Sequence, residues 1–133
     1  MTISTLNLPW PLDNRLRRFL EDALTEAGVT TKPGGTLSFR DPDYTPETGG
    51  YHPVEIAVGP GGIEYITDFA YAGQPPHCEL VKEIDFDFTL GLFQHYGFEY
   101  PIRRGRALFT IWQENFIAYH AHGAYAVTIE PTG

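Results

Sequence analysis

Three carboxylates, Glu83, Asp85 and Asp87, alternate with apolar residues along one short stretch of the chain. A period of two is typical of a β-strand, because successive side chains of a strand point to opposite faces of its sheet. The pattern therefore predicts that the three acids share one face of a sheet, about 6.5–7 Å from one another. The apolar residues between them would face the core.

Three interpretations of this acidic row stay open. Solvent-facing charges can discourage sheets from joining edge to edge. An acidic surface can instead bind a basic protein, for example by mimicking a nucleic-acid backbone. In the third interpretation, Asp85 and Asp87 join Asp68 from a neighbouring strand as oxygen ligands of Mg²⁺ or Ca²⁺. No calcium-loop spacing accompanies these residues, so we expect no metal ion and no cofactor.

The sequence contains no established pattern for nucleophilic catalysis. Ser4 and Ser38 are the only serines, and neither stands in a Gly-x-Ser-x-Gly motif. Cys78 is the single cysteine, which excludes an internal disulfide; its pairing with His77 or His52 as a thiolate remains an alternative. The five histidines lack the spacing of a zinc finger. We assign no catalytic residue, and an enzymatic activity stays an open question.

A second set of polar residues is predicted to converge on a pocket. Asn115 lies at the centre of the apolar face of a predicted helix, so we expect it to be buried and bonded to the main chain of a loop. Asp68 shares its strand face with Ile66 and Ala70 and should be half-buried. If these two side chains meet Tyr51 and His52, they line a small polar pocket. Tyr71, which follows Asp68 on the same strand, is a further binding candidate.

Two helices and several strands would position these residues. Apolar spacing predicts helices over residues 12–27 and 106–121, the first with Asp13 as its N-cap and Gly28 just beyond its end. Strands are expected over 36–40, 54–58, 63–71, 80–88 and 124–129, with a turn at 32–35 and a loop over 91–105. The order α-β-β-β-β-α-β predicts one α+β domain spanning residues 1–133. Its mainly antiparallel sheet would have four to five strands, with both helices on one face.

Charge is unevenly distributed along the chain. Residues 41–99 contain eleven carboxylates and one basic side chain, Lys82, whereas the whole chain carries a net charge of −8. Such segregation produces a strong local negative field, which repels phosphates and disfavours nucleic acids as direct partners. No apolar run is long enough to span a membrane. We expect a cytoplasmic protein without a targeting segment.

Several segments resemble an uncharacterised bacterial family, the domain-of-unknown-function family 2787 found in Vibrio and related bacteria. The resemblance covers roughly residues 39–119, and it rests on the residues at 49–56, 65–71, 83–88 and 112–116 and on Tyr119. It implies an α+β fold and supplies no catalytic residues.

Together these features favour a small acidic binding protein of the cytosol. In this interpretation a protein partner with a basic surface binds the acidic, aromatic-rich sheet and loops, and the protein is an accessory of mobile elements or defence systems. The alternative is a small-molecule-binding domain or hydrolase with a pocket around Tyr51, His52, Asp68 and Asn115. A pocket that is lined by two or more of these side chains and raises the pKa of a carboxylate would favour the alternative. A flat, open acidic face would favour the first interpretation.

Overall fold

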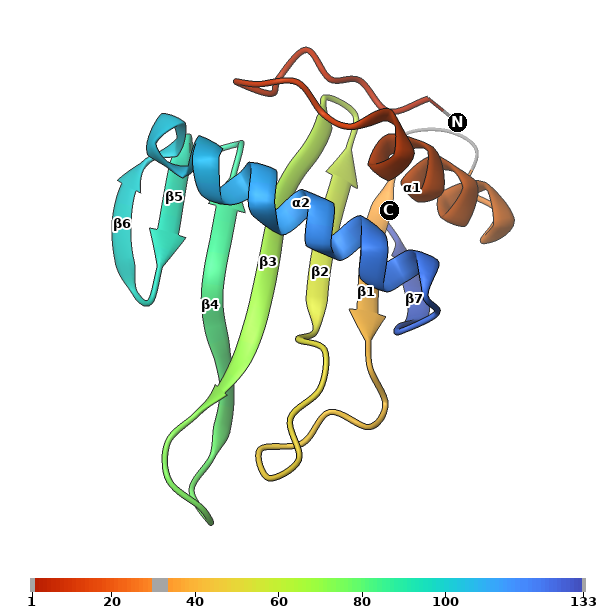
Figure 1. Cartoon of the computed structure of the whole chain (residues 1–133). Coiled ribbons are helices and arrows are strands. Elements are labelled where there is room, and N and C mark those ends of the chain that lie inside the picture. The colour runs from red at the N-terminus through yellow and green to blue at the C-terminus, as the bar shows by residue number, and fades with distance from the viewer. Residues whose placement is uncertain (1, 30–33, 133) are drawn as a thin grey trace.

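The computed structural model describes residues 2–29 and 34–132, and the predicted turn at 32–35 lies partly outside them. The elements run in the order shown in Figure 1. They are α1 (Asn14–Glu26), β1 (Gly35–Arg40), β2 (Val54–Gly59), β3 (Gly62–Ala72), β4 (Glu79–Asp87), β5 (Leu92–His95), β6 (Phe98–Pro101), the 3₁₀ helix η1 (Ile102–Gly105), α2 (Arg106–Ala121) and β7 (Ala126–Pro131).

The strands form one antiparallel sheet in the order β6-β5-β4-β3-β2-β1-β7. Consecutive strands from β1 to β6 are neighbours, and the final strand β7 returns to pair with β1. The α+β class and the two α-helices are confirmed. The predicted count of four to five strands is wrong, because the described residues contain seven.

The additional strands lie where the sequence predicted a loop, over residues 91–105. β5 and β6 are only four residues long, too short for alternation to stand out. The turn between them holds Tyr96 and Gly97 at φ values of 51° and 84°. Two successive positive φ values match the twist of a hairpin, so the turn closes tightly without the usual Asn-Gly signal.

Helix α1 confirms the predicted first helix. Leu16, Leu20 and Leu24 are fully buried, which places its apolar stripe on the core. The Asp13 side chain accepts a hydrogen bond from the Arg15 backbone N–H at 2.8 Å, and Gly28 has a left-handed φ of 83°. Both ends therefore have the predicted caps.

Helix α2 has the predicted bounds but a different buried face. Its buried residues include Phe109, Trp112 and Phe116, whereas Ile111 is 61% exposed. Asn115 is exposed, so the predicted burial of this amide is wrong. Apolar residues surround much of this helix, and periodicity alone could not decide which stripe faces inward. Phe116 packs against Phe39 of the sheet, and Trp112 packs against Phe86. The stripe of α2 that contains these two aromatic residues therefore faces the core, and Asn115 does not.

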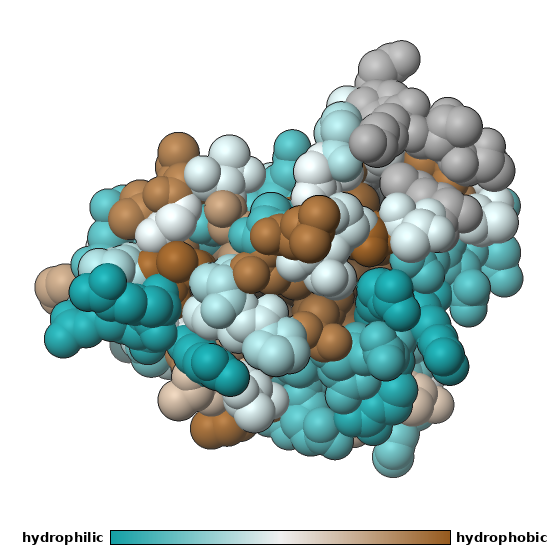
Figure 2. All heavy atoms as spheres, turned by 90° about the horizontal axis from the view of Figure 1, so that it is seen from above, coloured by the Kyte–Doolittle hydropathy of each residue, from teal (hydrophilic) through white to brown (hydrophobic). Residues whose placement is uncertain are grey.

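Figure 1 shows α2 crossing the strands obliquely, with α1 beside its C-terminal half. Both helices cover the same face of the sheet, here called the inner face. The core between the layers is strongly aromatic; for example, Phe86 stacks on Phe93 with ring centroids 5.4 Å apart. Figure 2 views the molecule from the end where the N-terminal segment lies. Apolar residues gather near the centre of this surface, and polar residues surround them. Neither helix in the described part of the chain is long and apolar enough to cross a membrane.

Candidate functional site

A β-bulge in β4 redirects one of the three alternating carboxylates. Asp68 of β3 pairs with Ile84, but the next residue, Phe69, pairs with Lys82. Glu83 is therefore an extra residue in β4 without a partner in the register. A bulge bends its strand and re-aims side chains. Glu83 consequently reaches the inner face, and the prediction that the three acids share one face is wrong.

Asp85 and Asp87 keep the regular alternation and lie on the outer face, away from the helices. They pair with Thr67 and Tyr65 of β3, and the Thr67 hydroxyl donates to Asp85 at 2.7 Å. Burial raises the pKa of Asp85, partly offset by the bond from Thr67 and the charge of Lys82. Because Asp68 points to the inner face, it cannot coordinate a metal ion together with Asp85 and Asp87.

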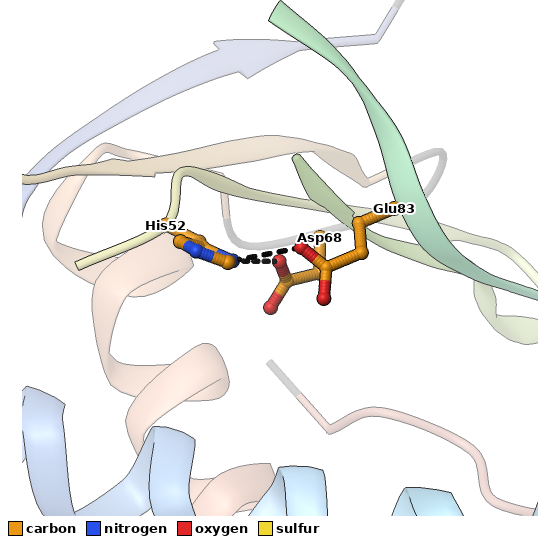
Figure 3. Close-up of side chains that lie close together, drawn as sticks. All are labelled: His52, Asp68 and Glu83. Atoms are coloured by element: carbon orange, nitrogen blue, oxygen red, sulfur yellow. Dashed lines mark hydrogen bonds and ion pairs between the residues drawn. The ribbon is translucent and has the colours of Figure 1, made fainter. Parts of the chain in front are cut away.

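On the inner face, Glu83 meets an acid–histidine pair (Figure 3). His52 lies just before β2, Asp68 lies in the middle of β3, and Glu83 lies at the bulge of β4. The Nδ1 atom of His52 is 3.0 Å from Asp68 Oδ1 and 3.3 Å from Glu83 Oε2. One imidazole nitrogen thus faces one oxygen from each carboxylate. We call His52, Asp68 and Glu83 the acid–histidine cluster.

The remaining oxygen of each carboxylate accepts a hydrogen bond from an aromatic side chain. The indole N–H of Trp112, on α2, donates to Asp68 Oδ2 at 3.0 Å in a buried position. The Tyr96 hydroxyl, in the β5–β6 turn, donates to Glu83 Oε1 at 3.3 Å. These two bonds orient the carboxylates so that one oxygen of each faces His52.

Electrostatics favour a protonated His52. The hydrogen bond to Asp68 raises the pKa of His52, burial opposes that rise, and the charges of Asp68 and Glu83 add to it. The negative charge of Glu83 likewise raises the pKa of Tyr96. Even with an imidazolium present, two carboxylates face a single positive charge. The cluster therefore keeps a surplus of about one negative charge, at a site where solvent screening is reduced.

A pocket of about 320 Å³ opens beside the cluster. Its volume is near the lower end of the range of small-molecule sites, about 300–1,000 Å³. It is lined by Gly50, Tyr51, His52, Asp68, Trp112, Asn115, Phe116, Tyr119 and Tyr125. The rings of Tyr51 and Tyr119 lie 4.7 Å apart, and Phe116 lies 5.3 Å from Tyr125. Five aromatic residues thus line a cavity that also contains the carboxylate of Asp68.

The loop before β2 holds Tyr51 and His52 in place. The Asp41 side chain accepts hydrogen bonds from the backbone N–H groups of Asp43 and Tyr51, at 2.9 and 3.0 Å. Gly50 has a φ of 141°, and a Cβ atom there would lie 2.7 Å from Asp41 Oδ2. A side chain at this position would displace the loop, so the glycine is needed for the orientation of its two neighbours.

The structure brings together most of the predicted binding candidates. Tyr51, His52, Asp68 and Asn115 line the pocket, as the sequence suggested, and Asn115 does so as an exposed residue. Glu83 lies against His52. Tyr71 is farther out, with its ring stacked on Tyr44 at 5.1 Å, and the Tyr44 ring lies 5.5 Å from His52. Asp85 and Asp87 are separated from this site by the sheet.

Sequence reasoning missed the aromatic partners of the site. It placed Trp112 on the core face of its helix but did not ask what its N–H would bond to. A buried indole N–H usually finds an acceptor, and Asp68 was an acid that shared its strand face with the apolar Ile66 and Ala70. Tyr96 and Tyr125 gave no comparable signal, because their contacts depend on a hairpin and on a late strand.

Comparisons with known proteins agree with this architecture. A family model described as "Protein of unknown function (DUF2787)" matches residues 14–130. The chain belongs to this family. The resemblance noted from the sequence segments is thereby confirmed over a longer region, and DUF2787 carries no assigned activity. A comparison with curated proteins finds no match.

Two solved structures of Vibrio cholerae proteins are similar to this DUF2787 chain. One is a hypothetical protein from the VSP-II pathogenicity island, with 35% identity and a TM-score of 0.81 over 97% of this chain and 99% of that protein. The other is a conserved hypothetical protein from the pathogenicity island VPI-2, with 37% identity and a TM-score of 0.76 over 90% of this chain and 95% of that protein. The second is described as sharing structural homology with the human P32 protein.

Proposed function

We propose that this protein is a binding protein whose aromatic-lined pocket receives a cationic group, namely a lysine or arginine side chain on a basic protein partner. The observation that carries the proposal is the combination of five aromatic residues with Asp68 in one pocket. Aromatic faces attract cations, by about 0.5–2 kcal/mol depending on how far the site is desolvated. The adjoining surplus negative charge of the acid–histidine cluster adds to that attraction.

The charge pattern of the chain supports a basic partner. The region 41–99, which supplies Tyr51, His52, Asp68 and Glu83, carries eleven carboxylates against one lysine. A field of this kind increases the association rate with a positively charged surface and is weakened by salt. The pocket would then fix one side chain of that surface. The pocket, rather than Asp85 and Asp87 on the outer face, is the centre of the interaction.

Two similar proteins are described as products of pathogenicity islands, which are mobile segments of bacterial genomes. This context supports a role as a cytoplasmic accessory of mobile elements, and we include that role in the proposal. It names no partner.

A small cationic molecule is the second candidate ligand, because a pocket of about 320 Å³ suits a single small group. The hydrolase alternative has less support. Both oxygens of Asp68 already accept hydrogen bonds, from Trp112 and His52. Among the described residues that line the pocket, none is Ser, Thr or Cys.

The proposal is tested with short peptides that differ at one side chain. Peptides of the same neutral sequence containing lysine, arginine or the uncharged isostere norleucine are titrated into the untagged protein and followed by NMR. We expect the lysine or arginine peptide to bind at least tenfold more tightly than the norleucine peptide. The shifted resonances should lie around the pocket.

A matched pair of variants assigns the binding to the pocket. Tyr119→Ala removes a partly exposed ring from its wall, and Phe98→Ala removes an exposed ring from β6, outside the residues that line it. We expect the first variant to lose the charge-selective binding and the second to keep it. Equal affinity for lysine and norleucine, or binding unchanged by Tyr119→Ala, would refute the proposal. A free amine that binds as well as the peptides would instead support the small-molecule candidate.

A further inference from the structure

The acid–histidine cluster has the composition of a metal centre assembled from three separate segments. His52, Asp68 and Glu83 each offer one ligand atom, and these atoms all lie within 4.8 Å of one another. Metal motifs are usually recognised by their spacing along the chain. These residues are separated by at least fourteen others and are brought together only by sheet pairing and by the bulge at Glu83.

The distances within the cluster suit a bound cation as well as a shared proton. Zinc and related ions bind histidine nitrogen and carboxylate oxygen at about 2.0–2.2 Å. Two such ligands on one tetrahedral or octahedral ion are then separated by about 3.0–3.4 Å. The Nδ1 atom of His52 is 3.0 Å from the Asp68 oxygen and 3.3 Å from the Glu83 oxygen. An ion could therefore take the place of the proton after small adjustments of the side chains.

The supporting hydrogen bonds resemble those that orient metal ligands. In metal centres, the ligating carboxylates are commonly held through their second oxygen by neighbouring donors. Here Trp112 holds the second oxygen of Asp68, and Tyr96 holds the second oxygen of Glu83. Neither donor belongs to the cluster. The side chains of Asp68 and Glu83 are only 12% and 17% exposed, whereas His52 is 38% exposed and leaves a side open for an ion to enter.

The charges also match a dication. With a neutral imidazole the cluster carries two negative charges, and a divalent ion would balance both. Because one ligand is a nitrogen, the site favours Zn²⁺ or Co²⁺ over Mg²⁺ and Ca²⁺, which prefer oxygen-only shells. Three protein ligands leave at least one coordination position open, as in zinc sites that also bind water or a substrate.

We propose that His52, Asp68 and Glu83 form a site for a divalent transition-metal ion of the zinc class, at the edge of the aromatic pocket. Binding replaces the proton on His52 Nδ1, and that proton is released to solvent. The proposal does not depend on what the pocket receives. A bound dication would remove the surplus negative charge, so it would also weaken the binding of a cationic group in the pocket.

The test uses the untagged full chain and the metal ions alone. Zn²⁺ and Co²⁺ are titrated by calorimetry, and Co²⁺ is also followed through its visible absorption, which reports the number and type of ligands. We expect one equivalent to bind, a melting temperature that rises with ion concentration, and an affinity at least tenfold weaker for Mg²⁺ and Ca²⁺.

Three variants separate this site from adventitious binding. His52→Gln and Glu83→Gln should each weaken Co²⁺ binding at least tenfold, while the fold is checked by circular dichroism. Asp85→Asn, which changes a carboxylate on the outer face, should bind as the wild type does. Cys78→Ser removes the one cysteine of the chain and should also leave binding unchanged.

Two results would overturn the proposal. One is no saturable binding of Zn²⁺ or Co²⁺ up to about 1 mM, which corresponds to less than about 4 kcal/mol of binding free energy. The other is wild-type binding by both His52→Gln and Glu83→Gln. Neither result bears on the peptide titration, which is done in the presence of a chelator, so the two proposals fail separately.

Discussion

The two faces of β4 place similar carboxylates in different surroundings. Glu83, on the inner face, lies 3.3 Å from His52 and accepts a hydrogen bond from Tyr96. Asp85, two residues later on the outer face, accepts a bond from Thr67 and is penalised by its burial. The bulge at Glu83 produces this difference. The carboxylates of β4 therefore do not form one acidic surface, and only the inner one lies beside a histidine.

Asp68→Asn should give the largest loss of stability, because each oxygen of this carboxylate accepts a hydrogen bond. An amide keeps one oxygen and turns an N–H group toward either Trp112 or His52, which leaves a donor facing a donor. Hydrogen bonds to charged groups contribute about 1.5–3 kcal/mol, so we expect the free energy of unfolding to fall by about that amount. Urea denaturation measures it. A loss below about 0.5 kcal/mol would show that Asp68 does not hold this site together.

Asp85→Asn should change the stability less than Asp68→Asn does, and it should increase the stability rather than lower it. The raised pKa of Asp85 means that its ionised form is less favourable in the folded chain than in the unfolded chain. Its contribution to stability is therefore present at acid pH, below the unfolded pKa, and is lost as the pH rises through the raised folded pKa. The asparagine oxygen can still accept the bond from Thr67. We expect the variant to be more stable by about 0.5 kcal/mol at neutral pH.

That gain should disappear as the pH falls, because the wild-type carboxyl becomes protonated and loses the penalty. Denaturation curves of wild type and Asp85→Asn at neutral pH and at about pH 3 test the sign. A variant less stable than wild type at neutral pH would mean that the ionised carboxylate stabilises the outer face. The two substitutions remove the same charge, so their opposite signs would establish the difference between the faces.

Much of the fold could be predicted from the sequence, because most elements have a clear period. The stripe of Leu16, Leu20 and Leu24 defined α1, and alternation defined the strands from β1 to β4. Hairpin β5–β6 could not be predicted in this way, since four-residue strands offer two inward side chains at most. Its turn at Tyr96 and Gly97 also lacks the residue pair that usually marks such a turn.

The site was predictable in part. Tyr51, His52, Asp68 and Asn115 were expected to converge, and the structure brings them to one pocket. The position of Glu83 was not predictable, because a bulge depends on the pairing of two strands and leaves no mark in a regular alternation. Asn115 was misplaced because α2 has two apolar stripes, and only packing against the aromatic core selects between them.

The central claim is that the bulge places Glu83, and not Asp85, beside His52. Double-mutant cycles test it directly. The free energies of unfolding are measured for wild type, for the single variants His52→Gln, Glu83→Gln and Asp85→Asn, and for the two double variants that contain His52→Gln. The measurements are made with a chelator at about pH 6, because histidine is largely charged at that pH. We predict a coupling of about 0.5–1 kcal/mol between His52 and Glu83, and below about 0.3 kcal/mol between His52 and Asp85. Equal couplings, or a larger one for Asp85, would contradict the account.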